Sequence, residues 1–149
     1  MLTARDIMTT NIHTVTSEMS IEDLARTFME KSVSTLPVVD PAGKLVGMVS
    51  ATDLIEQDKP LHIPTVIAIF DMVIYLEREK NFRDEVEKIT ARTVGEICAK
   101  EVVTCPPEME VAKIAALMTE KKVHLLPVIE DGKILGVVGR HDIIRSMNL

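Results

Sequence analysis

Two aspartates occupy positions where a carboxylate has two possible roles. Asp53 follows Ser50 by three residues, and Asp142 follows Gly139 at the same spacing, each near the expected start of a helix. A carboxylate there is stabilised by the helix dipole and accepts hydroxyl donors, while neighbouring backbone N–H groups can receive a phosphate. The alternative is that each carboxylate only caps its helix. The pattern therefore predicts either a pair of ligand sites or a pair of helix caps.

The residue groupings that catalysis or metal binding needs are missing from the sequence. The four histidines are scattered, with none spaced from another histidine or a carboxylate pair like metal ligands. No serine has a Gly-x-Ser-x-Gly setting, and no cysteine and histidine are arranged as nucleophile and base. A glycine-rich phosphate loop is also missing. We therefore expect neither enzyme activity nor a metal.

Charge and composition narrow the class of protein further. A net charge of −6 repels a nucleic-acid backbone, so we expect no nucleic-acid partner. The longest apolar run, 63–76, contains Pro64 and Asp71 and is too short for a bilayer, and the N-terminus lacks the apolar segment of a signal peptide. Cys98 and Cys105 are too few for a disulfide framework. These features predict a cytoplasmic protein without a membrane partner.

An internal repeat organises the chain. Residues 36–40 read Leu-Pro-Val-Val-Asp and recur as Leu-Pro-Val-Ile-Glu at 126–130, displaced by 90 positions. One residue is then lost in a turn, after which Asp53 corresponds to Asp142. The repeat predicts two related units, at 1–56 and 93–149, joined by a linker at 57–92.

Each copy predicts the same elements. One helix in each copy has apolar residues at helical spacing. These residues are Ile21, Leu24, Ala25 and Phe28 in the first copy, and Val111, Ile114, Ala115 and Met118 in the second. Ser20 and Asp23 are spaced as a capping box, whereas Glu110 makes a weaker start. A hairpin follows, turning at 40–43 or 130–132, and leads into a second helix near Asp53 or Asp142.

The predicted fold class is α+β, with each repeat running strand, helix, strand, strand, helix. Because the apolar face of each small sheet must be buried, we expect the two copies to pack against each other about a pseudo-twofold axis, with a cleft where they meet. The linker combines an apolar segment, 66–76, with a charged helical stretch, 77–88. We expect the apolar segment to pack against the module or a dimer partner, or alternatively to form a lid over the cleft.

The repeats resemble the CBS domain family, and the pair resembles a Bateman module. The resemblance rests on the two Leu-Pro-Val segments, each followed by a glycine turn, and on the motifs Gly-Met-Val-Ser-Ala-Thr-Asp-Leu at 47–54 and Gly-Val-Val-Gly-Arg-His-Asp-Ile at 136–143. It implies binding of an adenosine derivative such as AMP, ADP or ATP in the inter-repeat cleft. In that pattern the last aspartate accepts ribose hydroxyls, and the Ser or Thr three residues earlier contacts ribose or phosphate.

Carried over by position, the resemblance assigns binding residues in both repeats. In the first they are Thr14, Val15, Thr35, Leu36, Pro37, Ser50 and Asp53, and in the second Thr104, Leu125, Pro127, Arg140, His141 and Asp142. Gly139 stands where the second repeat needs its hydroxyl, and a guanidinium from Arg140 is a candidate replacement. We therefore predict unequal sites, with the Ser50/Asp53 site the better adenosine binder.

Function classes remain open at this point. A regulatory module would signal through packing changes to an unidentified effector protein, with AMP or ATP as its regulatory ligand. The alternatives are a ligand-free structural or oligomerisation module, or a binder of S-adenosylmethionine or NAD. The resemblance also implies a homodimer, which is the commonest oligomer.

Overall fold

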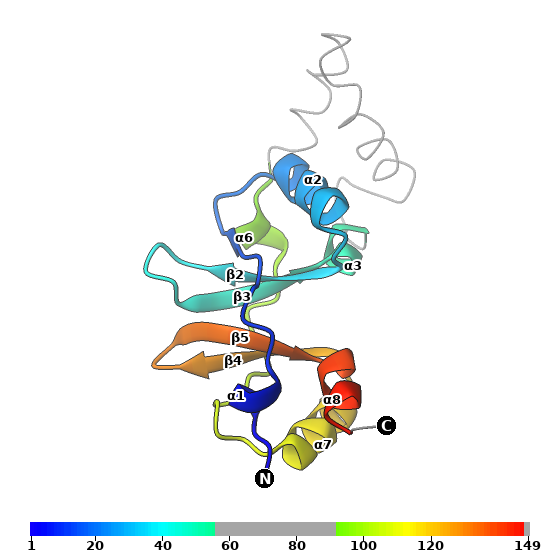
Figure 1. Cartoon of the computed structure of the whole chain (residues 1–149). Coiled ribbons are helices and arrows are strands. Elements are labelled where there is room, and N and C mark those ends of the chain that lie inside the picture. The colour runs from blue at the N-terminus through cyan, green and yellow to red at the C-terminus, as the bar shows by residue number, and fades with distance from the viewer. Residues whose placement is uncertain (56–91, 148–149) are drawn as a thin grey trace, which may run out of the picture. The chain divides into compact units, whose positions relative to one another are not determined.

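The computed structural model describes residues 1–55 and 92–147 (Figure 1). The predicted apolar segment 66–76 and the charged helical stretch 77–88 lie outside these described residues, so both stay predictions.

The first repeat has the predicted order of strand, helix, strand, strand, helix (Figure 1). Its elements are β1 (Val15–Thr16), α2 (Ile21–Lys31), β2 (Thr35–Val39), β3 (Leu45–Ser50) and α3 (Ala51–Ile55). β1 pairs in parallel with β2, and the sheet order is β1-β2-β3. The hairpin turns at Gly43, whose φ of +85° belongs to the left-handed region that glycine adopts without strain. The carboxylate of Asp40 accepts two backbone N–H groups within this turn.

The second repeat keeps the order but shortens its first strand. Only Cys105 bridges Val128 in parallel, in place of a full strand. The later elements are α7 (Val111–Lys121), β4 (Leu125–Glu130), β5 (Lys133–Gly139) and α8 (Arg140–Ser146). β4 and β5 pair antiparallel, with Leu125 opposite Gly139. The α+β class and the two repeats are therefore confirmed.

The predicted apolar stripe on α2 is fully buried, whereas the one on α7 is only partly so. Ser20 caps α2 by accepting the N–H of Asp23 at 3.1 Å, as expected, and Glu110 makes no side-chain cap for α7. Along α7, Ile114 and Met118 are buried but Val111 and Ala115 are partly exposed. Val111 lies in the first turn beside exposed Leu2, and Ala115 borders a pocket.

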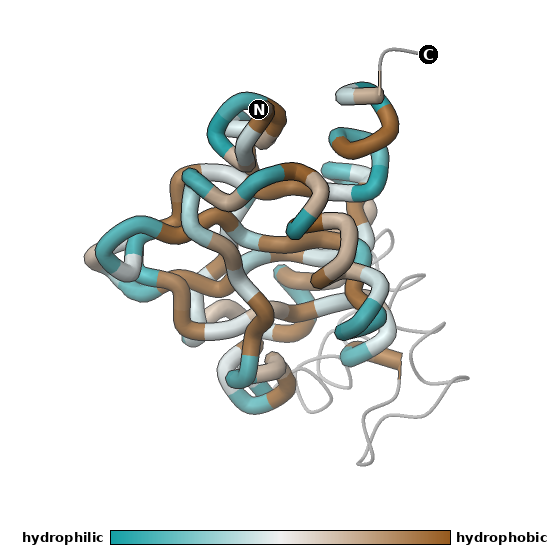
Figure 2. The backbone as a smooth tube through the Cα atoms, turned by 90° about the horizontal axis from the view of Figure 1, so that it is seen from below, coloured by the Kyte–Doolittle hydropathy of each residue, from teal (hydrophilic) through white to brown (hydrophobic). Residues whose placement is uncertain are grey.

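The apolar core is mostly aliphatic in both repeats, with Phe28 as a buried aromatic member in the first. In Figure 2 hydrophobic residues recur along the tube, with hydrophilic residues at the outlying turns. One cluster gathers around Leu24, Leu36 and Val49, and the other around Ile114, Leu126 and Val138. Because these side chains fix the strands against their helices, they hold the end of each hairpin in place.

The N-terminal segment packs with the second repeat. α1 (Ala4–Ile7) buries Ala4, whose N–H donates to the carbonyl of Met109 at 2.8 Å. Further on, Thr9 forms an antiparallel bridge with Val137 in β5. This brings the hydroxyl of Thr9 close to the start of α8.

The segment ahead of the second repeat packs with the first in the same way. α6 (Val94–Ile97) buries Val94, whose N–H donates to the carbonyl of Met19 at 2.8 Å, and Ala99 bridges Met48 in β3. The described residues accordingly form two compact units, one of residues 1–13, 40–45 and 101–147 and the other of residues 14–39, 46–55 and 92–100. These units do not follow the repeat boundaries, because the leading segment of each repeat belongs to the unit of the other repeat, and the hairpin turn at 40–45 is grouped with the second repeat.

Candidate functional site

In the first repeat, Ser50 and Asp53 form a reciprocal pair where β3 meets α3. The N–H of Ser50 donates to Oδ2 of Asp53 at 2.8 Å, and the N–H of Asp53 donates to Oγ of Ser50 at 3.1 Å. This is a capping box, with each side chain satisfying a backbone donor at the helix start. Both residues are partly exposed. With respect to the described residues, Oδ1 of Asp53 and the hydroxyl proton of Ser50 have no partner.

The other predicted residues of the first repeat line the strands beside this pair. The N–H of Ala51 donates to the carbonyl of Ser34 at 2.9 Å, so the start of β2, at Thr35, lies beside the end of β3. Val15 pairs with Val38, which follows Pro37 on β2. Among the predicted residues, Val15, Leu36 and Pro37 are buried, Thr35 is partly exposed and Thr14 is exposed. The buried ones can therefore offer a ligand only backbone atoms.

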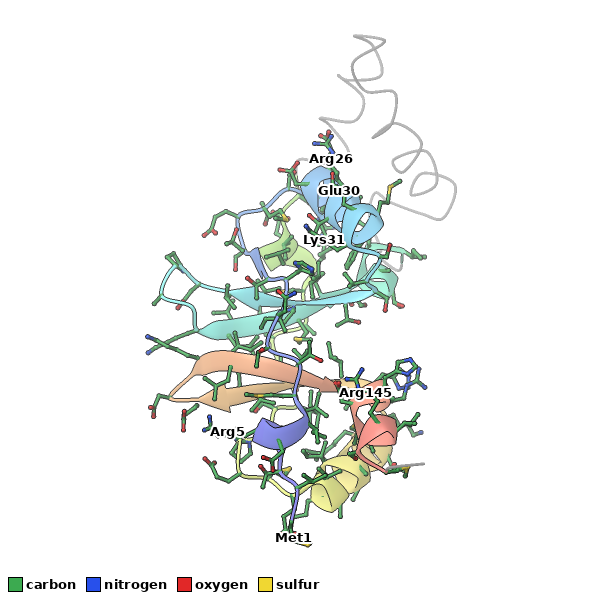
Figure 3. All side chains as sticks on the ribbon, viewed as in Figure 1. Met1, Arg5, Arg26, Glu30, Lys31 and Arg145 are labelled. Carbon is green, nitrogen blue, oxygen red and sulfur yellow. The ribbon has the colours of Figure 1, made fainter. Side chains whose placement is uncertain are left out.

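In the second repeat, Asp142 is buried and already well supplied with donors. Its side chain is 7% exposed. Oδ2 accepts the N–H of Gly139 at 2.7 Å, which reproduces the backbone half of the first repeat's pair. Oδ1 accepts the Thr9 hydroxyl at 3.2 Å and is ion-paired with Arg145 (Figure 3 labels Arg145 on α8). The missing hydroxyl at Gly139 leaves the N–H of Asp142 without the cap that Ser50 gives Asp53.

The remaining predicted residues of the second repeat divide into two groups. Leu125 lies opposite Gly139 and is partly exposed, Pro127 is buried, and exposed Thr104 precedes the Cys105 bridge. Arg140 and His141 are both exposed on the first turn of α8. Arg140 lines a pocket between α7 and α8 that Asp142 does not line.

Thr9 and Arg145 belong to the Asp142 environment, and the sequence prediction did not include them. Arg145 follows Asp142 by three residues on one helix, which is a spacing for an ion pair that the sequence displays. Thr9 stands 133 positions away, and only the exchange of leading segments brings it to Asp142. The spacing of Arg145 and Asp142 could have been read from the sequence, whereas the proximity of Thr9 to Asp142 could not.

Cys105 sits at the core of the second repeat's strand bridge. Its N–H donates to the carbonyl of Pro127 at 3.0 Å, and its carbonyl accepts the N–H of Ile129 at 2.9 Å. Burial raises the pKa of its thiol to about 11, because the thiolate would lose its hydration. The thiol therefore stays protonated, and its role here is packing.

Within residues 1–55 and 92–147, no group of three or more His, Cys, Asp or Glu side chains is arranged to hold a metal ion. No helix in the same ranges is long and apolar enough to cross a membrane.

The two hairpins, each leading into a helix whose first turn carries an aspartate, define the class: a tandem α+β module. The CBS domain model matches residues 4–59 and 94–149. The chain therefore belongs to the CBS domain family and carries two copies of the domain.

Comparison with individual proteins gives the same family. The chain is 28% identical to chloroplastic CBSX2 of Arabidopsis thaliana over 97% of its own length and 63% of the relative's. The crystal structure of CBSX2 in complex with AMP is 26% identical, has a TM-score of 0.73, and is matched over 99% of this chain and 97% of that one.

Two prokaryotic relatives differ in how much of their own length the chain covers. An uncharacterized protein of Methanocaldococcus jannaschii, MJ1426, is 26% identical over 96% of this chain and 89% of its own length. A homoserine O-acetyltransferase of Methanohalobium evestigatum is 32% identical over 94% of this chain but only 23% of the enzyme.

Proposed function

We propose that this protein is a regulatory module that binds an adenosine-containing nucleotide, AMP or ATP, with its principal site at Ser50 and Asp53. The observation that carries the proposal is the state of Asp53. Its Oδ2 is held by the Ser50 N–H, which fixes the carboxylate, while its Oδ1 has no partner among the described residues. A fixed carboxylate with a free oxygen is suited to accept the hydroxyl donors of a ribose. The AMP complex of the similar protein CBSX2 supports this ligand class.

The first repeat supplies further groups that suit a nucleoside. The Ser50 oxygen already accepts the Asp53 N–H at 3.1 Å, so its proton is oriented away from that bond and is free to donate. Val15, Leu36 and Pro37 are buried beside this pair, so they can offer a nucleoside backbone polar atoms but not their side chains. Small-molecule sites typically use a few placed polar groups of this kind.

The second site is the weaker binder in this proposal. A ribose at Asp142 competes with Thr9 and Arg145 for Oδ1, and Gly139 contributes no hydroxyl. Displacing those donors costs free energy that binding at Asp53 does not require.

Regulation, rather than catalysis, is the role we propose for the bound nucleotide. The contacts of Ser50 and Asp53 lie at the junction of a hairpin and a helix, where a ligand's interactions would favour one packing state over another. The output passes to an effector protein or domain. In the similar homoserine O-acetyltransferase, the part that matches this chain makes up only 23% of the enzyme's length, so sequences like this one occur within larger enzymes.

A titration calorimetry experiment with AMP tests the proposal through Asp53→Asn. Asparagine still accepts the Ser50 N–H but replaces one acceptor oxygen by an NH₂ donor, so the helix cap is kept and ribose binding is not. We expect AMP affinity to fall at least about tenfold, or roughly 1.4 kcal/mol. Glu30→Gln, on an exposed position of α2 labelled in Figure 3, is the control for the lost charge, and its affinity should equal that of the wild type.

The specific competing function is a structural module without ligand, which the closed environment of Asp142 and the missing hydroxyl at Gly139 favour. Thermal-shift measurements with AMP, ADP, ATP, S-adenosylmethionine and NAD separate the two. A binder is stabilised in proportion to the logarithm of ligand concentration, and a scaffold is not. If none of the five compounds stabilises the protein, the structural module without ligand is the correct function.

A further inference from the structure

In each leading segment, the residue two positions after the short helix bridges the strand that leads to an aspartate. Thr9 follows α1 and bridges Val137, and Ala99 follows α6 and bridges Met48 (Figure 1 labels α1 and α6). Thr9 and Val137 exchange backbone hydrogen bonds of 2.8 and 2.9 Å, and Ala99 and Met48 exchange bonds of 2.8 and 3.0 Å. Positions 9 and 99 are therefore structurally equivalent.

The two aspartate carboxylates are also held in the same way. Oδ2 of Asp53 accepts the N–H of Ser50 at 2.8 Å, and Oδ2 of Asp142 accepts the N–H of Gly139 at 2.7 Å. In both repeats this leaves Oδ1 as the oxygen that is available to another donor. Because the backbone matches on both sides, a hydroxyl at position 99 would have the same access to Oδ1 of Asp53 that Thr9 has to Oδ1 of Asp142.

The side chains at these two equivalent positions differ in one donor. The hydroxyl of Thr9 donates to Oδ1 of Asp142 at 3.2 Å. Alanine at position 99 has no donor, and no described residue donates to Oδ1 of Asp53. Thr9 and Ala99 are both exposed, so packing in the core does not account for either residue. The difference therefore bears on the carboxylate that each position faces.

We propose that the residue at position 9 or 99 determines how strongly each site selects a ribose. Ala99 leaves Oδ1 of Asp53 open to the ribose hydroxyls, whereas Thr9 engages the equivalent oxygen of Asp142. A site whose polar atom needs a ligand hydroxyl discriminates strongly against an analogue without it, because that atom is then left unpaired. This inference rests on the proposed nucleotide function and adds the residue that sets its selectivity.

Each of these selectivity residues belongs to the sequence repeat opposite to the site that it controls. Position 9 lies in the first repeat and acts on Asp142, and position 99 lies ahead of the second repeat's Cys105 bridge and acts on Asp53. A substitution in one repeat should therefore change ligand selectivity in the other repeat.

Titration calorimetry with AMP and dideoxy-AMP, which lacks both ribose hydroxyls, tests the proposal at the first site. The Asp142→Asn background isolates that site, and there we expect AMP to bind at least about tenfold more tightly than dideoxy-AMP. Ala99→Thr should reduce this preference to about threefold or less, because its hydroxyl engages Oδ1 of Asp53. Ala99→Val has the same shape without the donor and should leave the preference unchanged.

The converse exchange tests the second site on the Asp53→Asn background. Thr9→Val should raise the preference for AMP over dideoxy-AMP by about threefold or more, because Oδ1 of Asp142 loses a competing donor. Thr9→Ser keeps the hydroxyl and should behave like the unsubstituted background. If Thr9 has only a structural role, its loss changes the affinity for both nucleotides alike, and their ratio stays constant.

Three results would overturn the inference. The first is a preference for AMP that Ala99→Thr leaves unchanged, and the second is an equal decrease in Ala99→Thr and Ala99→Val. The third is a greater preference in Ala99→Thr, which would mean that the hydroxyl contacts the ribose instead of competing with it. Failure of the proposed function gives a different result, because the wild-type protein would then bind neither nucleotide, and this inference would fail with it.

Discussion

Asp53 and Asp142 stand at equivalent positions but differ in how many of their lone pairs are engaged. A carboxylate offers about four lone-pair positions. Among the described residues, Asp53 gives one to Ser50, whereas Asp142 gives three to Gly139, Thr9 and Arg145. The sequence predicts unequal nucleotide sites from Gly139 alone, and the contacts of Asp142 support the same proposal for a second reason, because a ribose would compete with Thr9 and Arg145 for the carboxylate.

At this scale, Arg145→Gln is expected to strengthen nucleotide binding at the second repeat. Glutamine cannot hold Oδ1 of Asp142 as an ion pair, so that oxygen becomes available to a ribose hydroxyl. Stability should change by less than about 1 kcal/mol, because the Arg145 side chain is 69% exposed and its ion pair is screened. Calorimetry with AMP on the Asp53→Asn background isolates the second site. If Arg145→Gln weakens AMP there, Arg145 contacts the ligand instead of competing with it.

At the scale of elements, the repeat pattern predicted the hairpins, α2, α7 and the helices after each hairpin. It did not predict that residues 1–13 and 93–100 would exchange units, because the matching residues Thr3 and Thr93 cap their short helices identically in either arrangement. Nor did it predict the pocket beside Ala115, because helical spacing alone counts that residue as core. The local spacing of apolar residues specifies a helix or strand and its apolar face. Long-range packing determines which other segment contacts that face.

The exchanged segments explain why two strands carry glycine. A Cβ on Gly47 would lie 2.7 Å from the carbonyl oxygen of Ala99, and one on Gly136 would lie 2.7 Å from that of Thr9. We expect Gly47→Ala and Gly136→Ala each to cost about 1–3 kcal/mol, because backbone must move to relieve the overlap. Urea unfolding measures the loss.

Gly139→Ser is the matched control for those two variants. A Cβ there meets nothing closer than 3.4 Å, and the serine oxygen would cap the Asp142 N–H as Ser50 does for Asp53. Its stability should equal or exceed the wild type's by a few tenths of a kcal/mol. A loss at Gly139→Ser as large as at Gly47→Ala would mean that the close approach is not the cause.

The buried thiol of Cys105 predicts a dependence of stability on pH. Burial raises the pKa of this thiol to about 11 in the folded protein, so above the ordinary thiol pKa the unfolded chain loses a proton that the folded chain keeps. The contribution of this thiol to the free energy of unfolding is therefore complete below about pH 8.5 and declines as pH rises toward 11. The unfolding free energy of the wild type should fall more than that of Cys105→Val between about pH 8 and about pH 10.5. Equal falls would remove Cys105 as the cause.

For the whole molecule, exposed apolar side chains point to assembly. Ile144 on α8 is 53% exposed and Met147, the C-cap residue of α8, is 60% exposed. Met29 on α2 and Ile55 on α3 are 43% and 40% exposed. Helix surfaces of this kind are often covered by another chain. The homodimer expected from the sequence stays a prediction, which light scattering of the purified protein measures.

The central claim, that an adenosine nucleotide binds first at Asp53, is tested most directly by native mass spectrometry at rising AMP concentration. The wild-type protein should take up one nucleotide per chain before a second. Asp142→Asn should keep that first uptake, and Asp53→Asn should lose it. Uptake that is unchanged in Asp53→Asn, or lost in Asp142→Asn, would contradict the claim.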